Sequence, residues 1–123
     1  MAIVQDGVIA WGRSQAVGGD PKPIACFLRE GDGVIAGACG RTEFHRLFVS
    51  YLWVSEPNRG QGIGTEALRR LEAAARDRGA TDSLIETLDE RVARLYRELG
   101  YVEVTVIQGY VGEFNRHILV KSL

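Results

Sequence analysis

The sequence predicts a single α/β domain, in which helices pack against a mixed β-sheet. Three observations support this fold class. Apolar, β-branched and aromatic runs typical of strands recur along the chain. Two later segments, 63–79 and 89–100, have apolar residues at the three-to-four spacing of helices. A glycine-rich loop joins the third strand-like run to the first of these helices. The 123 residues suffice for one small domain with its own core, and we expect that domain to span 1–123.

The composition is ordinary for a globular protein, with 46% apolar residues, 25% charged residues and a net charge of −1. This balance argues against a nucleic-acid-binding function. No apolar run approaches the roughly 20 residues of a membrane helix, and the start of the chain lacks the pattern of a secretory signal. We therefore expect a cytoplasmic protein that binds neither nucleic acid nor membranes.

The first 20 residues predict a weak helix that ends near Gly18 and Gly19. Its apolar residues have a loosely helical spacing, and internal glycines lower its helix propensity. These apolar residues are Val4, Val8, Ile9 and Trp11.

Segments 24–30 and 34–43 predict a β-hairpin around Asp32-Gly33, a favoured two-residue turn. That turn would place Cys26 opposite Cys39. Both strands are apolar on both faces, so we expect a sheet that is covered on both sides.

Neither the cysteines nor the histidines predict a metal site. Two cysteines are too few for a disulfide framework, and we expect both to be small buried side chains in a reducing compartment. His45 and His117 are far apart in sequence and are interpreted as structural or surface residues.

The remaining elements follow in order. A third strand covers 45–56, and the clearest helix begins after the glycine loop and ends at Gly79. A short strand at 82–88 precedes a second amphipathic helix at 89–100, with Asp89 as a plausible N-cap. Strands at 101–108 and 116–123 close the domain, separated by a loop at 109–115.

The loop between strand and helix has the composition of a phosphate-binding site. Gly60, Gly62 and Gly64 would let a ligand approach the backbone closely, and Arg59 adds positive charge. Two other interpretations remain: a connection whose glycines only permit unusual dihedral angles, and a dinucleotide-binding fingerprint with Glu86 as its acid. A Walker loop is excluded, because the helix start lacks Gly-Lys-Ser/Thr.

These residues resemble the GNAT superfamily of N-acetyltransferases. The family signature, Arg/Gln-x-x-Gly-x-Gly/Ala, matches the run from Arg59 to Gly64. Leu52-Trp53-Val54 followed by Pro57 resembles the Leu-x-Val-x-Pro motif that precedes this loop in the family. Leu95-Tyr96 and Leu99-Gly100-Tyr101 match a later pair of family motifs. The resemblance extends from about residue 24 to the C-terminus.

The resemblance implies a mixed sheet that is splayed where acetyl-CoA binds, flanked by helices, with a shortened N-terminal region. It implies that the loop amides bind the pyrophosphate and that the strand before the loop holds the pantetheine arm. Asp89 stands where the family usually has a cofactor-contacting Asn. The cofactor-binding residues would be Leu52, Trp53, Val54, Arg59, Gly60, Gln61, Gly62, Ile63, Gly64, Thr65 and Asp89.

Two residues are candidates for catalysis. Tyr96 could protonate the departing thiolate, since a phenol with a pKa of about 10 is protonated at neutral pH; a core aromatic is the alternative. Glu86 could receive the proton of the amine, directly or through water, or be a solvated residue at the strand end. Tyr51 and Glu56 are weaker candidates for this base.

The resemblance therefore implies an acetyl-CoA-dependent N-acetyltransferase that acts on a primary amine of a small molecule or peptide. The amine would attack the thioester directly in a ternary complex, without a metal. An acidic groove beside Glu86 would favour cationic peptides or polyamines. The alternative is a non-catalytic acyl-CoA-binding or regulatory domain. We also expect a homodimer, because the shortened N-terminus leaves apolar sheet surface to cover.

Overall fold

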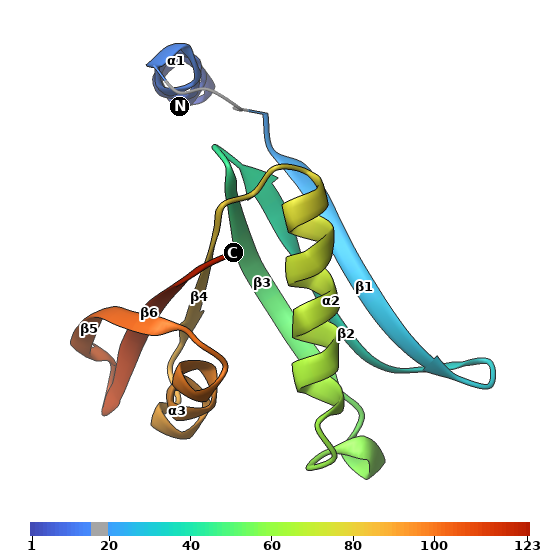
Figure 1. The fold of residues 1–123 in the computed structure, drawn as a ribbon. Coiled ribbons are helices and arrows are strands. Elements are labelled where there is room, and N and C mark those ends of the chain that lie inside the picture. Colours follow the sequence, from blue (N-terminus) through green and yellow to red (C-terminus); the bar gives the residue numbers. More distant parts are fainter. Residues whose placement is uncertain (16–19) are drawn as a thin grey trace.

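The computed structural model describes residues 1–15 and 20–123, and gives side chains for all of these except 13–15. One six-stranded sheet organises the molecule (Figure 1). The expected end of the first helix near Gly18 and Gly19 lies outside the described residues. The elements are α1 (Ala2–Gln15), β1 (Lys22–Glu30), β2 (Gly33–Glu43), β3 (Arg46–Val54), a short 3-10 helix (Glu56–Asn58), α2 (Ile63–Asp77), β4 (Asp82–Thr87), α3 (Glu90–Glu98), β5 (Val102–Val111) and β6 (Phe114–Ser122).

The sheet is mixed, as predicted, and its strand order is β1-β2-β3-β4-β6-β5. Neighbouring strands are antiparallel except for β3 and β4, which are parallel. The chain crosses from β3 to β4 through α2, as a parallel pair requires.

The sheet is splayed between β3 and β4, which confirms the predicted split. The two strands pair over only three residues each, and Phe48 opposite Leu84 is the last pair. A bidentate ion pair joins the two strands where they are paired. Arg46 Nε and Nη2 each donate to an Asp82 oxygen at 2.7 Å. Hydrogen bonding to Arg46 lowers the pKa of Asp82. Beyond Phe48, the edge of β3 that faces β4 is left without a strand partner.

A bulge in β3 accompanies the splay. Tyr51 lies opposite Cys39 but Val49 lies opposite Gly40, so Ser50 is the extra residue. A Cβ atom at Gly40 would lie 1.9 Å from the carbonyl oxygen of Phe48. Glycine at this position therefore allows β2 to approach the bulged strand.

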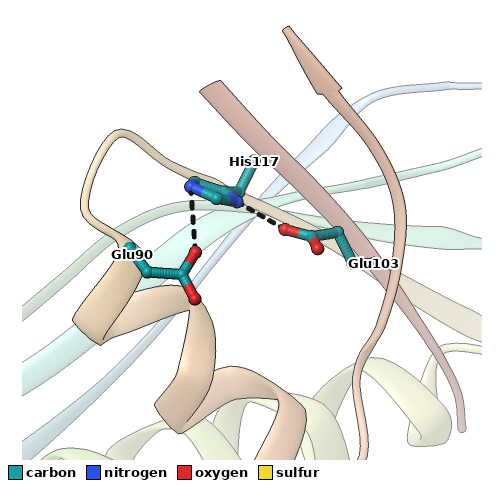
Figure 2. A group of neighbouring side chains, drawn as sticks. All are labelled: Glu90, Glu103 and His117. Carbon is teal, nitrogen blue, oxygen red and sulfur yellow. Dashed lines mark hydrogen bonds and ion pairs between the residues drawn. The ribbon is translucent and has the colours of Figure 1, made fainter. Parts of the chain in front are cut away.

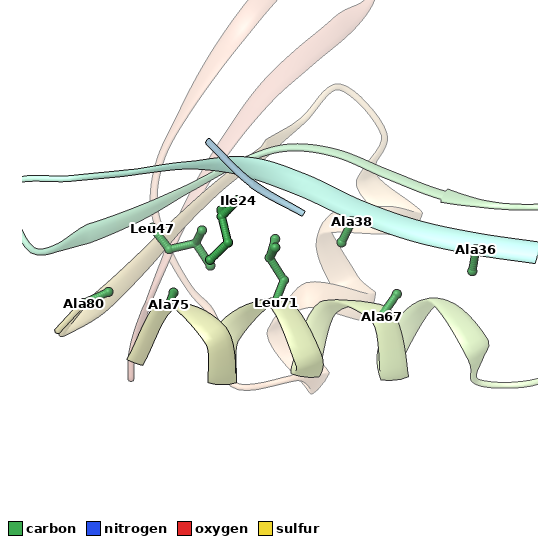
Figure 3. Packing of buried hydrophobic residues seen from close by; sticks show 8 residues of the cluster. All are labelled: Ile24, Ala36, Ala38, Leu47, Ala67, Leu71, Ala75 and Ala80. Carbon is green, nitrogen blue, oxygen red and sulfur yellow. The ribbon is translucent and has the colours of Figure 1, made fainter. Parts of the chain in front are cut away.

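Helices α2 and α3 cover the same face of the sheet. Ile24 and Leu47 point from the strands toward Leu71 and Ala75 of α2 (Figure 3). Leu68 of α2 belongs to a second buried cluster, completed by residues of β4, α3 and β6 and by the residue before β5: Ile85, Ala93, Tyr96, Tyr101 and Leu119. No helix in the described part of the chain is long and apolar enough to cross a membrane.

The opposite face of the sheet is not covered by any described helix, so the expectation of a sheet covered on both sides is wrong for this chain as described. Phe27, Tyr51 and Trp53 are exposed there. Helix α1 lies apart from the sheet instead of packing on this face (Figure 1). The strands carry apolar residues on both faces, but the described residues leave those on one face exposed.

The register of the first hairpin differs from the prediction. Glu30 pairs with Gly33, so the turn residues are Gly31 and Asp32, and a further shift follows Leu28. Cys26 therefore lies opposite Ala38 and not opposite Cys39. Cys26 packs against the core beneath α2, whereas Cys39 is on the other face.

The last hairpin is longer than predicted. The expected loop at 109–115 is largely strand, since β5 runs to Val111 and β6 begins at Phe114. Gly112, with a φ of 56°, supplies the left-handed turn conformation that makes this short connection possible.

We predict that Gly40→Ala destabilises the fold by at least about 1–3 kcal/mol, because a methyl group would collide with the Phe48 carbonyl. Urea unfolding measures the change. The control is Gly33→Ala at the start of the same strand, where the nearest atom to a new Cβ is 3.7 Å away. Equal unfolding free energies for the two variants would contradict the proposed role of Gly40.

Candidate active site

A cleft of about 510 Å³ lies where the end of β3, the start of α2 and one side of α3 meet. We call it the α2–α3 cleft. Many of the residues expected to bind the cofactor line it, although they come from a strand, a loop and a helix. The lining residues are Leu52, Trp53, Val54, Asn58, Arg59, Gly60, Gly62, Ile63, Gly64, Thr65, Val92, Leu95, Tyr96 and Leu99.

Hydrogen bonds stabilise the conformation of the loop between β3 and α2. Asn58 Nδ2 donates to Ser55 Oγ at 2.6 Å across the 3-10 turn, and Arg59 Nε donates to the Val54 carbonyl at 3.0 Å. Gln61 donates to the Pro57 carbonyl at 3.4 Å and does not line the cleft. Gln61 thus stabilises the loop, while Asn58 is a cleft residue that the sequence pattern did not identify.

The N-terminus of α2 opens onto the cleft. Gly60 and Gly62 have φ angles of 76° and 77°, which favour glycine. Gly62 caps the helix without a side chain, and the Glu66 amide makes the first backbone bond, to the Gly62 carbonyl at 3.1 Å. The amides of Ile63, Gly64 and Thr65 therefore have no partner within the helix. Such a helix end attracts anions.

Gly64 has a different role from the expected close approach of a ligand. A Cβ atom there would lie 3.0 Å from Val54 Cγ2, so this glycine lets the first turn of α2 pack on the end of β3. At Gly62, by contrast, a Cβ atom would meet nothing within 4 Å.

Tyr96 reaches the cleft from α3. The side chain is only 6% exposed, and its ring packs against that of Tyr101 with centroids 6.0 Å apart. Burial raises the pKa of the Tyr96 phenol. Its hydroxyl has no hydrogen-bond partner among the described residues. Buried polar groups are nearly always hydrogen-bonded, so this phenol calls for an explanation.

Glu86 lies in a second cleft, of about 820 Å³, on the opposite face of the sheet. We call it the Glu86 cleft. It borders the same gap between β3 and β4, so Glu86 and Tyr96 approach the gap from opposite faces. It is lined by Arg41, Phe48, Val49, Ser50, Tyr51, Leu84, Glu86, Thr87, Leu88 and Arg116.

The Glu86 cleft has mixed charge and is not the acidic groove that would favour polyamines. Arg116 Nη2 donates to Glu86 Oε2, and Arg116 Nη1 donates to the Tyr110 hydroxyl at 2.9 Å. The Arg41 guanidinium lies 4.1 Å from the centre of the Phe48 ring. The sequence does not predict either arginine, because Arg41 comes from β2 and Arg116 from β6, far from Glu86 in sequence.

The other candidates are distributed differently. Tyr51 lines the Glu86 cleft, whereas Glu56 lines neither cleft. Asp89 caps α3, its Oδ1 accepting from the Arg91 amide at 2.8 Å, and it does not line the α2–α3 cleft. Hydrogen bonding from Arg91 lowers the pKa of Asp89. His45 acts through its backbone, whose carbonyl accepts from the Thr81 amide at 2.8 Å.

His117 is buried in a cluster that attaches α3 to the last hairpin (Figure 2). Its Nδ1 contacts Glu103, and its Nε2 lies 3.4 Å from a Glu90 oxygen. Arg97 pairs with Glu90 at 2.7 Å and with Glu103 at 3.4 Å. The three side chains have the chemistry of metal ligands, but Arg97 already pairs with both carboxylates. We therefore interpret the cluster as an ion-pair network that fixes α3 and hence Tyr96.

The N-terminus of a helix opens beside a broken sheet, which is the arrangement that the glycine motif predicts. Comparisons with known proteins identify the family. A family profile described as the acetyltransferase (GNAT) family matches residues 7–101. The chain therefore belongs to the GNAT family of acetyltransferases.

A relative of known sequence supports the same family, and two solved structures share the fold. A blasticidin-S acetyltransferase of Streptomyces morookaense is 35% identical over 88 residues, which is 71% of this chain and 65% of that enzyme. A crystal structure of an acetyltransferase from Bacillus cereus has a TM-score of 0.91 at 23% identity, covering 99% of this chain and 90% of that one. A GNAT acetyltransferase from Elizabethkingia anophelis with acetyl-CoA bound has a TM-score of 0.70 at 16% identity, covering 80% and 75%.

We predict that Gly62→Asp weakens acetyl-CoA binding at least roughly tenfold more than Gly62→Asn. The two side chains have the same size and both tolerate a positive φ, so they differ in charge and in the N–H donors of the Asn amide. A carboxylate about 4 Å from a phosphate costs roughly 1–4 kcal/mol near a protein surface. Calorimetric titration with acetyl-CoA measures both affinities. Equal affinities for the two variants would mean that the phosphates bind elsewhere.

Proposed function

We propose that this protein is an acetyl-CoA-dependent N-acetyltransferase that transfers an acetyl group to a primary amine in a ternary complex. The observation that carries the proposal is the pair of clefts on opposite faces of one gap in the sheet. One cleft has the N-terminus of α2 and a buried phenol without a hydrogen-bond partner among the described residues. The other has a carboxylate at its wall. Two substrates could therefore meet at the gap without competing for one surface.

The residues of the α2–α3 cleft fit the cosubstrate. The amides of Ile63, Gly64 and Thr65 would hold the pyrophosphate, with Arg59 beside them. The edge of β3 from Leu52 to Val54 would offer its backbone to the amides of the pantetheine arm. Trp53 would contribute its backbone there, because its side chain lies on the uncovered face of the sheet. Gln61 and Asp89 would act indirectly, by shaping the loop and by capping α3.

Tyr96 is proposed to protonate the sulfur as it leaves. Acetyl-CoA supplies an activated acyl group; the amine nitrogen bonds to its carbonyl carbon while the carbon–sulfur bond breaks. Burial keeps the phenol protonated, since it raises a pKa that is ordinarily about 10. A hydroxyl without a hydrogen-bond partner among the described residues is free to donate to a ligand sulfur.

Glu86 is proposed to receive the proton of the amine, directly or through a water molecule. Its Oε2 accepts from Arg116, which holds the carboxylate in position beside the gap. The same ion pair gives the cleft mixed charge, which fits an amine on a polar small molecule or peptide better than a polyamine.

The alternative is a non-catalytic acyl-CoA-binding domain, because a fold alone does not establish activity. The unpartnered Tyr96 hydroxyl favours the enzyme, since a binding domain would have no use for a buried donor at the thioester. Acetyl-CoA binding without release of free thiol, across a panel of amines, would favour the alternative.

We further propose a cytoplasmic homodimer. Both cysteines are free, which fits a reducing compartment. The large exposed apolar face of the sheet fits an assembly of two chains.

We predict that Tyr96→Phe lowers turnover at least roughly tenfold while acetyl-CoA affinity stays nearly unchanged. The substitution keeps the ring that packs on Tyr101 and removes only the hydroxyl. Thiol release from acetyl-CoA in the presence of an accepted amine measures turnover, and calorimetry measures affinity. Turnover at the wild-type rate would show that Tyr96 is only a packing residue. A fall in thermal stability would identify a structural effect instead.

A further inference from the structure

Helix α1 carries an apolar stripe that faces solvent. Ile3, Val4 and Val8 share one side of the helix and are 88%, 68% and 66% exposed. Trp11 continues the stripe, and Gly7 lies within it. A helix of 14 residues is marginal on its own in water and needs packing of its apolar side. The stripe therefore has the properties of a contact surface.

The uncovered face of the sheet offers a matching surface. Two cross-strand rows run over β1, β2 and β3: Phe27, Gly37 and Trp53 form one, and Ala25, Cys39 and Tyr51 form the other. Directly opposed residues point to the same face. The small residues on β1 and β2 border the aromatic residues Phe27, Trp53 and Tyr51, of which Phe27 and Tyr51 are 57% and 75% exposed. These two rows form an apolar surface on the uncovered face, and we call this surface the open-face groove.

We propose that α1 of a second copy of this chain lies in the open-face groove, and that the two copies exchange their helices reciprocally. One chain carries both an exposed helix and an open-face groove, and its own helix lies away from that groove (Figure 1). In a dimer with a two-fold axis, each helix would be buried in the groove of the other chain. No helix or groove would then be left to bind a third copy. The helix is about 21 Å long, which fits within the length of the strands. The alignment with the Bacillus cereus structure extends over α1 as well.

The exchange would also complete the acceptor side of the protein. Tyr51 belongs both to the open-face groove and to the lining of the Glu86 cleft. A helix seated in the groove would therefore stand next to that cleft and form part of its outer wall. This consequence deepens the proposed function, but the exchange itself does not depend on acetyl transfer.

The first test compares two matched variants of α1. Val8→Asp places a carboxylate in the stripe, and Gln5→Asp places one on the side of the helix away from it. Both residues are exposed within one chain, so a monomer would tolerate them equally. Light scattering at micromolar concentration should give a dimer of about twice 13.5 kDa for the wild type and for Gln5→Asp, and a monomer for Val8→Asp. A monomeric wild type, or a dimer that survives Val8→Asp, would overturn the proposal.

The second test uses the native Cys39, which lies in the open-face groove. Cysteine is introduced singly at Val4, Gly7 or Val8, and the protein is oxidised without denaturant. We expect a covalent dimer from at least one stripe position, lost when Cys39→Ser is added and absent for Gln5→Cys. A disulfide within one chain would show that α1 folds back on its own sheet, and no Cys39-dependent disulfide would show that the groove has another occupant. Either result overturns the exchange, and neither bears on acetyl-CoA binding.

Discussion

A buried carboxylate, that of Glu72, joins the two halves of the broken sheet. It projects from α2, which packs on β1 to β3, yet its partners come from the other side of the gap. The Tyr101 hydroxyl donates to Glu72 Oε2 at 2.8 Å and Lys121 Nζ donates to Oε1 at 3.0 Å. Ser83 of β4 shares a hydrogen bond of 2.8 Å with the same Tyr101 hydroxyl. Removing Tyr101 or Lys121 while Glu72 stays buried would leave the carboxylate short of partners, which is strongly unfavourable.

The hydrogen bonds of Glu72 position the elements on both sides of the gap between β3 and β4. They fix α2, and so the amides at the start of that helix, relative to β4 and β6. Tyr101 also packs its ring on that of Tyr96, while the cluster around His117 attaches α3 to the last hairpin. The gap between β3 and β4 can therefore stay open, as ligand binding requires, without loss of a single folded domain. Gly40 and the bulge at Ser50 supply the local backbone change that starts the divergence.

The sequence predicts what is local. Periodicity gives the order of the elements, and the run from Arg59 to Gly64 identifies the loop because helix ends and glycine dihedral angles are local properties. It does not predict the register of the first hairpin, because the shift after Leu28 carries no clear residue signal. The pairing of Glu86 with Arg116 joins residues 30 positions apart and depends on the order of the strands. The sequence shows the motif around Gly100 and Tyr101, but it does not predict the hydrogen bond from Tyr101 to Glu72. The apolar strands were expected to be covered from within the chain, whereas the described residues leave one face open.

If acetyl-CoA binds in the gap between β3 and the start of α2, it will cover the backbone amides that line this gap. Amide hydrogen exchange with and without acetyl-CoA measures this, because it reports on individual backbone N–H groups. We expect slower exchange on binding at Ile63, Gly64 and Thr65 and along 52–54, with little change at Phe44 in the β2–β3 turn, which lies at the other end of β3. Binding without slower exchange at those amides, or slower exchange confined to the residues around Glu86, would contradict this expectation.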